Sequence, residues 1–318
     1  MRRSLARDFA AVADLAVEVR VAIGEREPDD PGPWTTLRIP EGAGIGRLVE
    51  LAAGNDSTVL IAPETTGLLA RLTRALERAG AVSLGCRAEG IELTADKLRL
   101  MEWFQASRVP TPESRLIRAG QGIPQDGRFP AVLKPVHGAG SLDTFFLSDP
   151  RTAKGPERAS DDFLIQPFQP GIPMSASFLV DLDGTAWLIG TGRQSIAIRE
   201  GRFEYRGGSV PEHCPEALPV LRRAVECVPG LGGFVGVDFV WNPEDRSAVV
   251  LEINPRVTTS HVGLSRLLPP GRLARAWLAA RGLAGASRDI LAGLADEVAS
   301  RPAVRFDAEG HVRPGGPE

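Results

Sequence analysis

The sequence predicts an α/β domain followed by a strand-rich α+β region. Three observations favour this fold class. The first ninety residues alternate short apolar runs with segments of helical period, a pattern typical of parallel βαβ structure. Later apolar runs succeed one another with little helix between them. Two of the connections, at 181–184 and 242–245, have hairpin-turn sequences. We therefore expect a domain boundary near residue 90.

The N-terminal ninety residues contain three apolar runs that we expect to form strands. They lie at 16–23, 58–62 and 82–85, and helices are expected between them at 46–53 and 67–79. The second helix is amphipathic, since its leucines recur at helical spacing and its arginines fall on the other face. This order predicts a doubly wound parallel sheet.

After residue 90 we expect one helix and then mostly strands. Thr94 is the predicted N-cap of a helix that carries Lys97 in its first turn and ends near Ser107. The expected strands are 131–134, 143–147, 163–166, 175–180, 186–190, 234–241, 248–253 and 304–306. Further helices are expected at 215–228 and 273–280.

Composition and charge narrow the function classes. The 318 residues carry a formal net charge of −3 with both signs interspersed, which argues against a nucleic-acid-binding protein. No secretory-type apolar region and no run of membrane-spanning length is found, so we expect no membrane partner. The cysteines Cys86, Cys214 and Cys227 are widely spaced and form no CxxC pair. This usage fits a reducing compartment, and we expect a cytoplasmic protein.

A polar strand pair carries the most informative pattern. Asp238 lies on one strand of the second hairpin, and Glu252 and Asn254 lie on its partner. Because strand side chains alternate, Glu252 and Asn254 should share a face while Leu251 and Ile253 point to the core. Two carboxylates and an amide oxygen make a hard oxygen site suited to Mg²⁺ on nucleotide phosphates. A solvated polar face is the alternative.

Three cationic residues accompany this predicted metal site. Arg256 follows the second strand and could neutralise an acyl-phosphate or a transferring phosphoryl group. Lys134 ends an apolar run, where an unpaired buried charge would be costly, so it predicts an anionic partner. Lys97 lies in the first turn of a helix, where the helix dipole disfavours a positive charge. A bound anion would explain its position, although a solvated lysine is the simpler alternative.

Two further segments could contact a nucleotide. A loop after Lys134 consists of His137, Gly138, Ala139, Gly140 and Ser141. Its glycines would let backbone N–H groups approach phosphates, although an ordinary hairpin loop also fits, and His137 is more often a loop residue than a catalyst. The run that ends in Gln166, Pro167 and Phe168 either exposes backbone groups to a flat ligand or is a plain linker.

In this order along the chain, these pieces resemble the ATP-grasp superfamily, over about residues 55–268. The resemblance implies a Rossmann-like pre-ATP-grasp domain at 1–90, a central subdomain at 91–167 and a C-terminal subdomain with the metal site and tail at 168–318. The two subdomains would clamp ATP between them.

The resemblance also implies roles for the residues above. The phosphate-contacting lysines of the family are matched by Lys97 and Lys134, and the loop that closes over the phosphates is matched by 138–141. The adenine-binding hinge is matched by 165–168. The ligands of Mg²⁺ or Mn²⁺ are matched by Asp238, Glu252 and Asn254, and the arginine that follows them by Arg256.

Within the superfamily the chain is most similar to the carboxylate–amine ligase branch that contains the tyramine–glutamate ligase of methanofuran biosynthesis. The stretches 61–65, 204–208 and 254–264 carry this similarity. It implies that ATP phosphorylates a small-molecule acid, with glutamate as the first choice, and that an amine displaces phosphate, as a step in cofactor biosynthesis. Candidates for substrate contacts, or plain surface residues, are Arg193, Gln194, Tyr205 and Arg206. A homodimer is the default expectation.

Two alternatives stay open: an ATP-grasp enzyme that phosphorylates like a kinase without ligation, and a nucleotide-binding module without turnover. The chain also departs from the family. Acidic residues that many relatives use for adenine and ribose are replaced by Gln166 and Pro173, which leaves nucleotide choice open. Relatives begin with a strand and a glycine-rich turn before the first helix, whereas this sequence starts near that helix, so we expect residues upstream to be missing.

Overall fold

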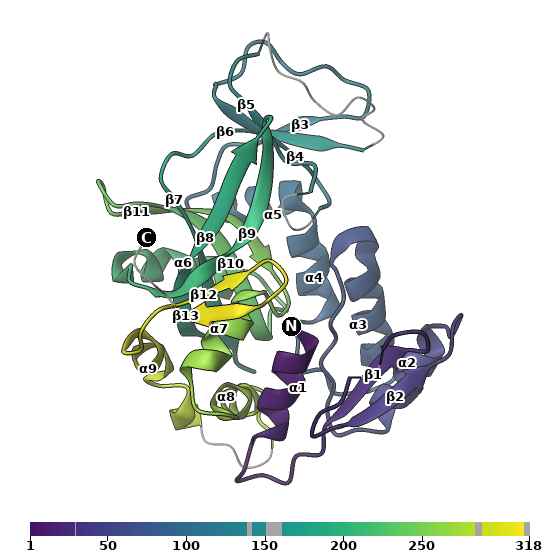
Figure 1. Cartoon of the computed structure of the whole chain (residues 1–318). Coiled ribbons are helices and arrows are strands. Elements are labelled where there is room, and N and C mark those ends of the chain that lie inside the picture. The colour runs from purple at the N-terminus through teal and green to yellow at the C-terminus, as the bar shows by residue number, and fades with distance from the viewer. Residues whose placement is uncertain (29, 139–141, 151–160, 284–287, 315–318) are drawn as a thin grey trace.

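The computed structural model describes residues 1–28, 30–138, 142–150, 161–283 and 288–314. Within these residues the fold is mixed α/β, with a two-stranded parallel sheet and an 11-stranded sheet. Figure 1 shows the large sheet extending from the body of the molecule into a smaller lobe built of β3 to β6. The long strands β8 and β9 run between the two parts.

The N-terminal part is built around the small parallel sheet. Its elements are α1 (Arg2–Ala10), β1 (Arg20–Gly24), β2 (Thr35–Ile39), α2 (Ile45–Ala53), the 3₁₀ turn η1 (Thr65–Gly67) and α3 (Leu68–Arg78). The two helices predicted at 46–53 and 67–79 are confirmed as α2 and α3. The predicted strand at 16–23 begins only at Arg20.

The runs predicted as strands at 58–62 and 82–85 meet at a single parallel bridge, between Thr58 and Ser83. The predicted strands are wrong here because the second run turns toward the other part of the molecule. The carbonyl of Leu84 accepts a hydrogen bond from Trp277 Nε1 at 2.8 Å. Gly233, at φ 65°, lies so close to that carbonyl that no side chain would fit.

Two helices, α4 (Ala88–Ala95) and α5 (Lys97–Ala106), connect the N-terminal part to the large sheet. The prediction that Thr94 caps the second helix is wrong. Thr94 lies in the last turn of α4 and donates its hydroxyl to the Gly90 carbonyl at 2.8 Å. Asp96 is the N-cap of α5, since its carboxylate accepts the backbone N–H groups of Leu98 and Arg99.

The large sheet has the strand order β11-β10-β7-β8-β9-β5-β4-β6-β3, with β12 paired to β9 and β13 paired to β12. Its strands are β3 (Arg115–Ile117), β4 (Ala131–Pro135), β5 (Phe145–Leu147), β6 (Phe163–Pro167), β7 (Ile172–Val180), β8 (Ala186–Arg199), β9 (Arg202–Glu212), β10 (Gly233–Asn242), β11 (Ser247–Asn254), β12 (Val304–Asp307) and β13 (Val312–Pro314). The antiparallel pairs β7/β8 and β10/β11 confirm both predicted hairpins. The strand β9 was not predicted.

The remaining helices cover the body of the sheet. The segment predicted as one helix at 215–228 is the 3₁₀ turn η2 (Pro215–Ala217) followed by α6 (Leu218–Glu226). The helix α8 (Arg272–Ala280) confirms the prediction at 273–280, whereas α7 (Ser260–Leu267), η3 (Arg288–Ile290) and α9 (Leu294–Ala299) were not predicted. In the described part of the chain, no helix has the length and apolar character needed to cross a membrane.

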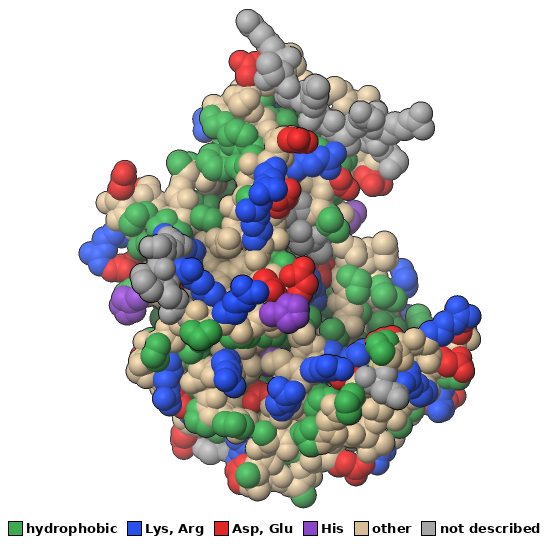
Figure 2. Space-filling view, viewed as in Figure 1, with side chains coloured by type: hydrophobic (Ala, Val, Ile, Leu, Met, Phe, Trp, Pro, Cys, Tyr) green, Lys and Arg blue, Asp and Glu red, His purple; other side chains and the backbone are tan. Residues whose placement is uncertain are grey.

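Alternation along the central strands sorts their side chains between two hydrophobic cores. Val235, Val237 and Phe239 of β10 belong to one core, together with α4, α5 and α6. Phe234 belongs to the other core, together with α1, α7 and α8. Asp238 is therefore turned away from the first core, onto the sheet face that lies toward the second. Figure 2 shows Lys and Arg side chains interspersed with Asp and Glu over the face in view.

Candidate active site

The polar face predicted on the second hairpin is assembled by the β10/β11 pairing. Asp238 lies directly opposite Glu252, and Gly236 lies opposite Asn254. Asn254 Nδ2 donates to Asp238 Oδ2 at 3.0 Å. The three predicted ligands are therefore neighbours in the folded chain.

A β-bulge changes one detail of this strand. Asp238 pairs with Glu252, but Phe239 pairs with Val250, so Leu251 has no partner on β10. Leu251 is only partly buried, and the expectation that it points into the core is wrong because the bulge breaks the alternation. Its carbonyl instead lies 3.5 Å from Lys134 Nζ.

Both predicted lysines reach this face from other elements. Lys97 opens α5, and its Nζ lies 3.6 Å from Glu252 Oε2. Its Nζ also donates to the Gly138 carbonyl at the start of the glycine loop. Lys134, near the end of β4, is buried, with only 8% of its surface exposed. The lobe and the hairpin therefore meet at two ammonium groups and a carboxylate.

Burial and mutual charge shift the pKa values of these groups. Burial raises the pKa of Asp238 well above its usual range, and the neighbouring Glu252 carboxylate raises it further. Burial also pushes the pKa of Glu252 upward, but the ammonium groups of Lys97 and Lys134 outweigh it and lower the pKa overall. Burial lowers the pKa of Lys134 to about 8, an effect that Lys97 reinforces and that Glu252 and Asp238 oppose.

This donor set fits a divalent cation. Asp238 and Glu252 are facing carboxylates on a partly buried face, so their repulsion would be relieved by a positive ion between them. Both Asp238 oxygens are already oriented by amide donors, Oδ2 by Asn254 and Oδ1 by Gln194 Nε2 at 2.9 Å. Such outer hydrogen bonds commonly fix metal-binding carboxylates. The oxygens of Asp238, Glu252 and Asn254 would suit Mg²⁺ or Mn²⁺.

The glycine loop lies only partly within the described residues. His137 is exposed, and its Nδ1 lies 3.3 Å from the Ala95 carbonyl. Gly138 contributes its carbonyl to Lys97. Ala139, Gly140 and Ser141, predicted to contact phosphate, lie outside the described residues.

The hinge residues have partners inside the protein. Gln166 is buried and donates from Nε2 to Ser114 Oγ at 2.6 Å. The Phe168 N–H donates to the Pro130 carbonyl at 2.9 Å, and its ring packs edge-on against Phe146. Pro167 has no N–H and therefore cannot donate a backbone hydrogen bond to a planar ligand at these positions.

The four candidate substrate residues divide into two groups. Gln194 reaches Asp238, as described above, and Tyr205 lies beside Thr259 and near Asp238. Burial, followed by the Asp238 carboxylate, raises the pKa of the Tyr205 hydroxyl, so the phenol stays protonated. Arg193 is exposed on the opposite face, and Arg206 forms an exposed ion pair with Glu204 at 3.1 Å. Alternation on β8 and β9 separates the two groups.

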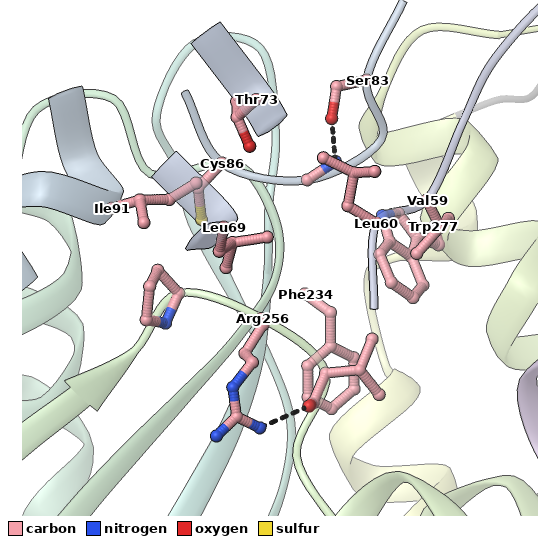
Figure 3. Close-up of a pocket in the computed structure, with 13 residues that line it drawn as sticks. Val59, Leu60, Leu69, Thr73, Ser83, Cys86, Ile91, Phe234, Arg256 and Trp277 are labelled. Atoms are coloured by element: carbon pink, nitrogen blue, oxygen red, sulfur yellow. Dashed lines mark hydrogen bonds between the residues drawn. The ribbon is translucent and has the colours of Figure 1, made fainter. Parts of the chain in front are cut away.

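Arg256 has a partner that sequence reasoning did not assign. Its Nε donates to Glu64 Oε2 at 2.5 Å and its Nη2 donates to Glu64 Oε1 at 3.2 Å. Glu64 belongs to the stretch 61–65 that carries the narrower family similarity, which was the only signal for it. Arg256 lines a cavity of about 20 Å³. Figure 3 shows that most of the side chains around it are apolar, among them Leu60, Leu69 and Phe234.

Two known domain families match this chain. The ATP-grasp domain family matches residues 94–260, and the pre ATP-grasp 3 domain family matches residues 17–91. The chain belongs to the ATP-grasp family and carries an N-terminal pre-ATP-grasp domain. The resemblance inferred from the sequence is thus confirmed.

The chain is also similar to two curated ligases. The chain is 28% identical to the tyramine–L-glutamate ligase of Methanocaldococcus fervens over 216 residues, 66% of this chain and 61% of that enzyme. The corresponding ligase of Methanocaldococcus jannaschii is also 28% identical, with 66% and 58% covered. The match thus spans about three fifths of the length of these curated relatives.

Solved structures agree on the fold. An ATP-grasp superfamily protein from Archaeoglobus fulgidus has a TM-score of 0.58 and 25% identity, over 86% of this chain and 75% of that one. An L-amino acid ligase from Bacillus licheniformis has a TM-score of 0.60 and 18% identity, over 82% and 66% of the two chains. Biotin carboxylase from Campylobacter jejuni has a TM-score of 0.70 and 13% identity, over 91% and 71%. The last two identities are low, so these two likenesses concern the fold alone.

Proposed function

We propose that the protein is an ATP-dependent carboxylate–amine ligase that works through an acyl-phosphate. One observation carries the proposal: Lys97 and Lys134 reach the paired carboxylates Asp238 and Glu252 from separate parts of the chain, and the charge of Arg256 acts on Asp238. That arrangement suits phosphoryl transfer, where catalysis depends on positioning and charge neutralisation rather than on an enzyme nucleophile. The ligases among the relatives described above support the same reaction class.

In this mechanism the residues of the chain bind and orient the reacting groups. Lys97 and Lys134 hold the α- and β-phosphates of ATP, and Asp238, Glu252 and Asn254 hold Mg²⁺ or Mn²⁺. The bound ion would supply the charge that neutralises the phosphate oxygens. An oxygen of the acid attacks the γ-phosphorus, and ADP leaves. The amine nitrogen then attacks the carbonyl carbon, the bond to the phosphate oxygen breaks, and phosphate leaves while the amine loses a proton. Arg256 stabilises the acyl-phosphate and the tetrahedral oxyanion.

The finer assignments belong to the same proposal. Glutamate is the acid we would test first and a small aromatic amine is the acceptor, because the curated relatives are named for these substrates. Gln194 and Tyr205 are the candidate substrate contacts on this face, since Arg193 and Arg206 lie elsewhere. The division into 1–90, 91–167 and 168–318, a cytoplasmic location, a homodimer and a role in cofactor biosynthesis remain predictions.

The test is ADP and phosphate release by the purified protein with ATP, Mg²⁺ and glutamate, with and without a panel of amines. The proposal predicts release that requires both acid and amine. It predicts a fall of about 10²–10³-fold in turnover for Glu252→Ala, the order of effect seen when a group that stabilises transition-state charge is removed. Glu244→Gln, an exposed carboxylate on the same hairpin, is the matched control and should change nothing.

The other outcomes identify the alternatives. ADP release that needs the acid but not the amine, with a stable phosphorylated product, would point to a phosphotransferase. ATP binding without ADP release, for every acid and amine supplied, would point to a nucleotide-binding module.

A further inference from the structure

Glu64 is buried at the edge of the N-terminal part, in a segment for which the proposed mechanism has no use. It precedes the 3₁₀ turn η1, where Thr66 and Gly67 adopt positive φ values of 58° and 66° and lead the chain into α3. Its side chain is 8% exposed. A carboxylate at that depth requires a charged or strongly hydrogen-bonding partner.

That partner is Arg256, which lies 192 residues further along the chain. The two parallel hydrogen bonds form a bidentate carboxylate–guanidinium pair, the geometry that holds an arginine most firmly. Arg256 itself lines a cavity whose walls include the apolar side chains Leu60, Leu69 and Phe234 (Figure 3). A charge pair is strengthened in such surroundings.

Arg256 has more donors than these two hydrogen bonds use. A guanidinium has five N–H donors. Glu64 takes the Nε donor and one on Nη2, and the Val257 carbonyl takes one on Nη1 at 3.2 Å. Among the bonds found in the described residues, one donor on Nη1 and one on Nη2 are left over. The positive charge is also near enough to Asp238 to act on that carboxylate.

We propose that Glu64 is a positioning residue: it holds Arg256 so that its two remaining N–H groups face the reacting oxyanion above the Asp238–Glu252 face. This inference rests on the proposed ligase function and extends it to the pre-ATP-grasp domain. Glu64 touches neither substrate nor nucleotide and acts only through Arg256. Rotation of the guanidinium by loss of Glu64 would misplace both donors, and a displacement of about 1 Å can cost on the order of 10²-fold in rate.

The first test is a double-mutant cycle on ligase turnover with Glu64→Gln, Arg256→Ala and the double variant. Glu64→Gln replaces one acceptor oxygen opposite the arginine donors with an amide N–H₂ group. We therefore expect kcat to fall by about ten- to a hundredfold while the KM for ATP stays nearly constant. The double variant should be no slower than Arg256→Ala alone, because Glu64 has no role once Arg256 is gone. Glu64→Asp, which keeps the charge, should recover part of kcat.

A second readout does not need ligase activity. In protein labelled with ¹⁵N-arginine, the Nε–H signal that disappears in Arg256→Lys identifies Arg256. That signal should exchange slowly in the wild type and become fast in Glu64→Gln. Glu92→Gln, which breaks the exposed pair with Arg74, is the control and should leave the signal unchanged. Thermal unfolding of each variant shows whether it has folded.

The outcomes separate this proposal from the proposed function. Wild-type kcat in a folded Glu64→Gln variant, or additive losses in the cycle, would overturn the positioning role while leaving the ligase standing. If the wild-type protein joins no acid to any amine, the proposed ligase function is wrong. The Arg256 Nε–H signal would then decide alone whether Glu64 holds Arg256: slow exchange lost in Glu64→Gln shows that it does, and unchanged exchange shows that it does not.

Discussion

His261, at the start of α7, is completely buried, and neither ring nitrogen has a hydrogen-bond partner among the residues that the structure describes. Its ring packs edge-on against Phe234, with centroids 5.9 Å apart. Burial, with a smaller effect from the N-terminal ammonium group, lowers the pKa of His261 to about 4. The residue therefore stays neutral in the folded protein at neutral pH.

This pKa predicts that acid destabilises the protein through His261. The imidazole titrates near 6.5 in the unfolded chain and near 4 in the folded chain, so between these pH values the unfolded chain binds more protons. The stability contributed by neutral His261 is complete above pH 6.5 and is lost as the pH falls toward 4, by about 3 kcal/mol. The measurement is the free energy of unfolding in urea at pH 7 and pH 4.5, for the wild type and His261→Leu.

The loss on acidification should be smaller in His261→Leu by about 2–3 kcal/mol. His213→Leu, which removes an exposed histidine, is the control for loss of one imidazole. An equal loss in His261→Leu and the wild type would show that His261 does not titrate as described.

At the residue scale, the sequence predicts the members of a strand face but not their partners. Glu252 and Asn254 could be assigned to one face because strand side chains alternate, and Asp238 because it lies across a hairpin. The partners Glu64 of Arg256 and Gln194 of Asp238 lie 192 and 44 residues away in the chain. No local pattern encodes such contacts, since they depend on how whole elements pack.

At the element scale, the N-cap residue of α5 determines where that helix begins, and Lys97 is its first residue. Asp96 accepts both Leu98 N–H and Arg99 N–H, at 3.1 Å each. We predict that Asp96→Ala lowers the free energy of unfolding by about 1 kcal/mol. It should also raise the KM for ATP, because Lys97 is the next residue.

Thermal unfolding and ATP kinetics measure both effects, with Asp96→Asn as the matched variant. Asparagine is also a good N-cap, so Asp96→Asn should remain close to the wild type in both measurements. If Asp96→Asn loses as much stability as Asp96→Ala, the cap hydrogen bonds are not the cause.

The element-scale predictions succeeded where periodicity was clear. Both hairpins and the helices α2, α3 and α8 were predicted, since they combine apolar periodicity with distinct ends. The helix α4 has only eight residues, and its exposed face consists of Glu89 and Glu92, so the sequence shows too short a period to predict it. Gly90 adds to this, because a side chain there would collide with the backbone at Gly230.

At the scale of the whole molecule, segments distant in sequence are tied together. Besides the Glu64–Arg256 pair, the Asp8 carboxylate of α1 accepts the N–H groups of Gly271 and Ala274 at the start of α8, at 2.9 Å each. The first helix therefore packs on the C-terminal helices, in the same core as α7 and α8. The sequence predicted the fold class from the order of elements, but this placement of α1 depends on tertiary contacts that the order does not specify.

The central claim is that one face of the molecule transfers phosphate to a carboxylate that an amine then attacks. The most direct measurement is isotope transfer: glutamate, or whichever acid the assay identifies, is labelled with ¹⁸O in its carboxylate and turned over with ATP, Mg²⁺ and the amine. The mechanism predicts one ¹⁸O atom in each phosphate released, because the bond that breaks joins the acid's carbonyl carbon to that oxygen. Unlabelled phosphate accompanying amide formation would contradict the acyl-phosphate mechanism.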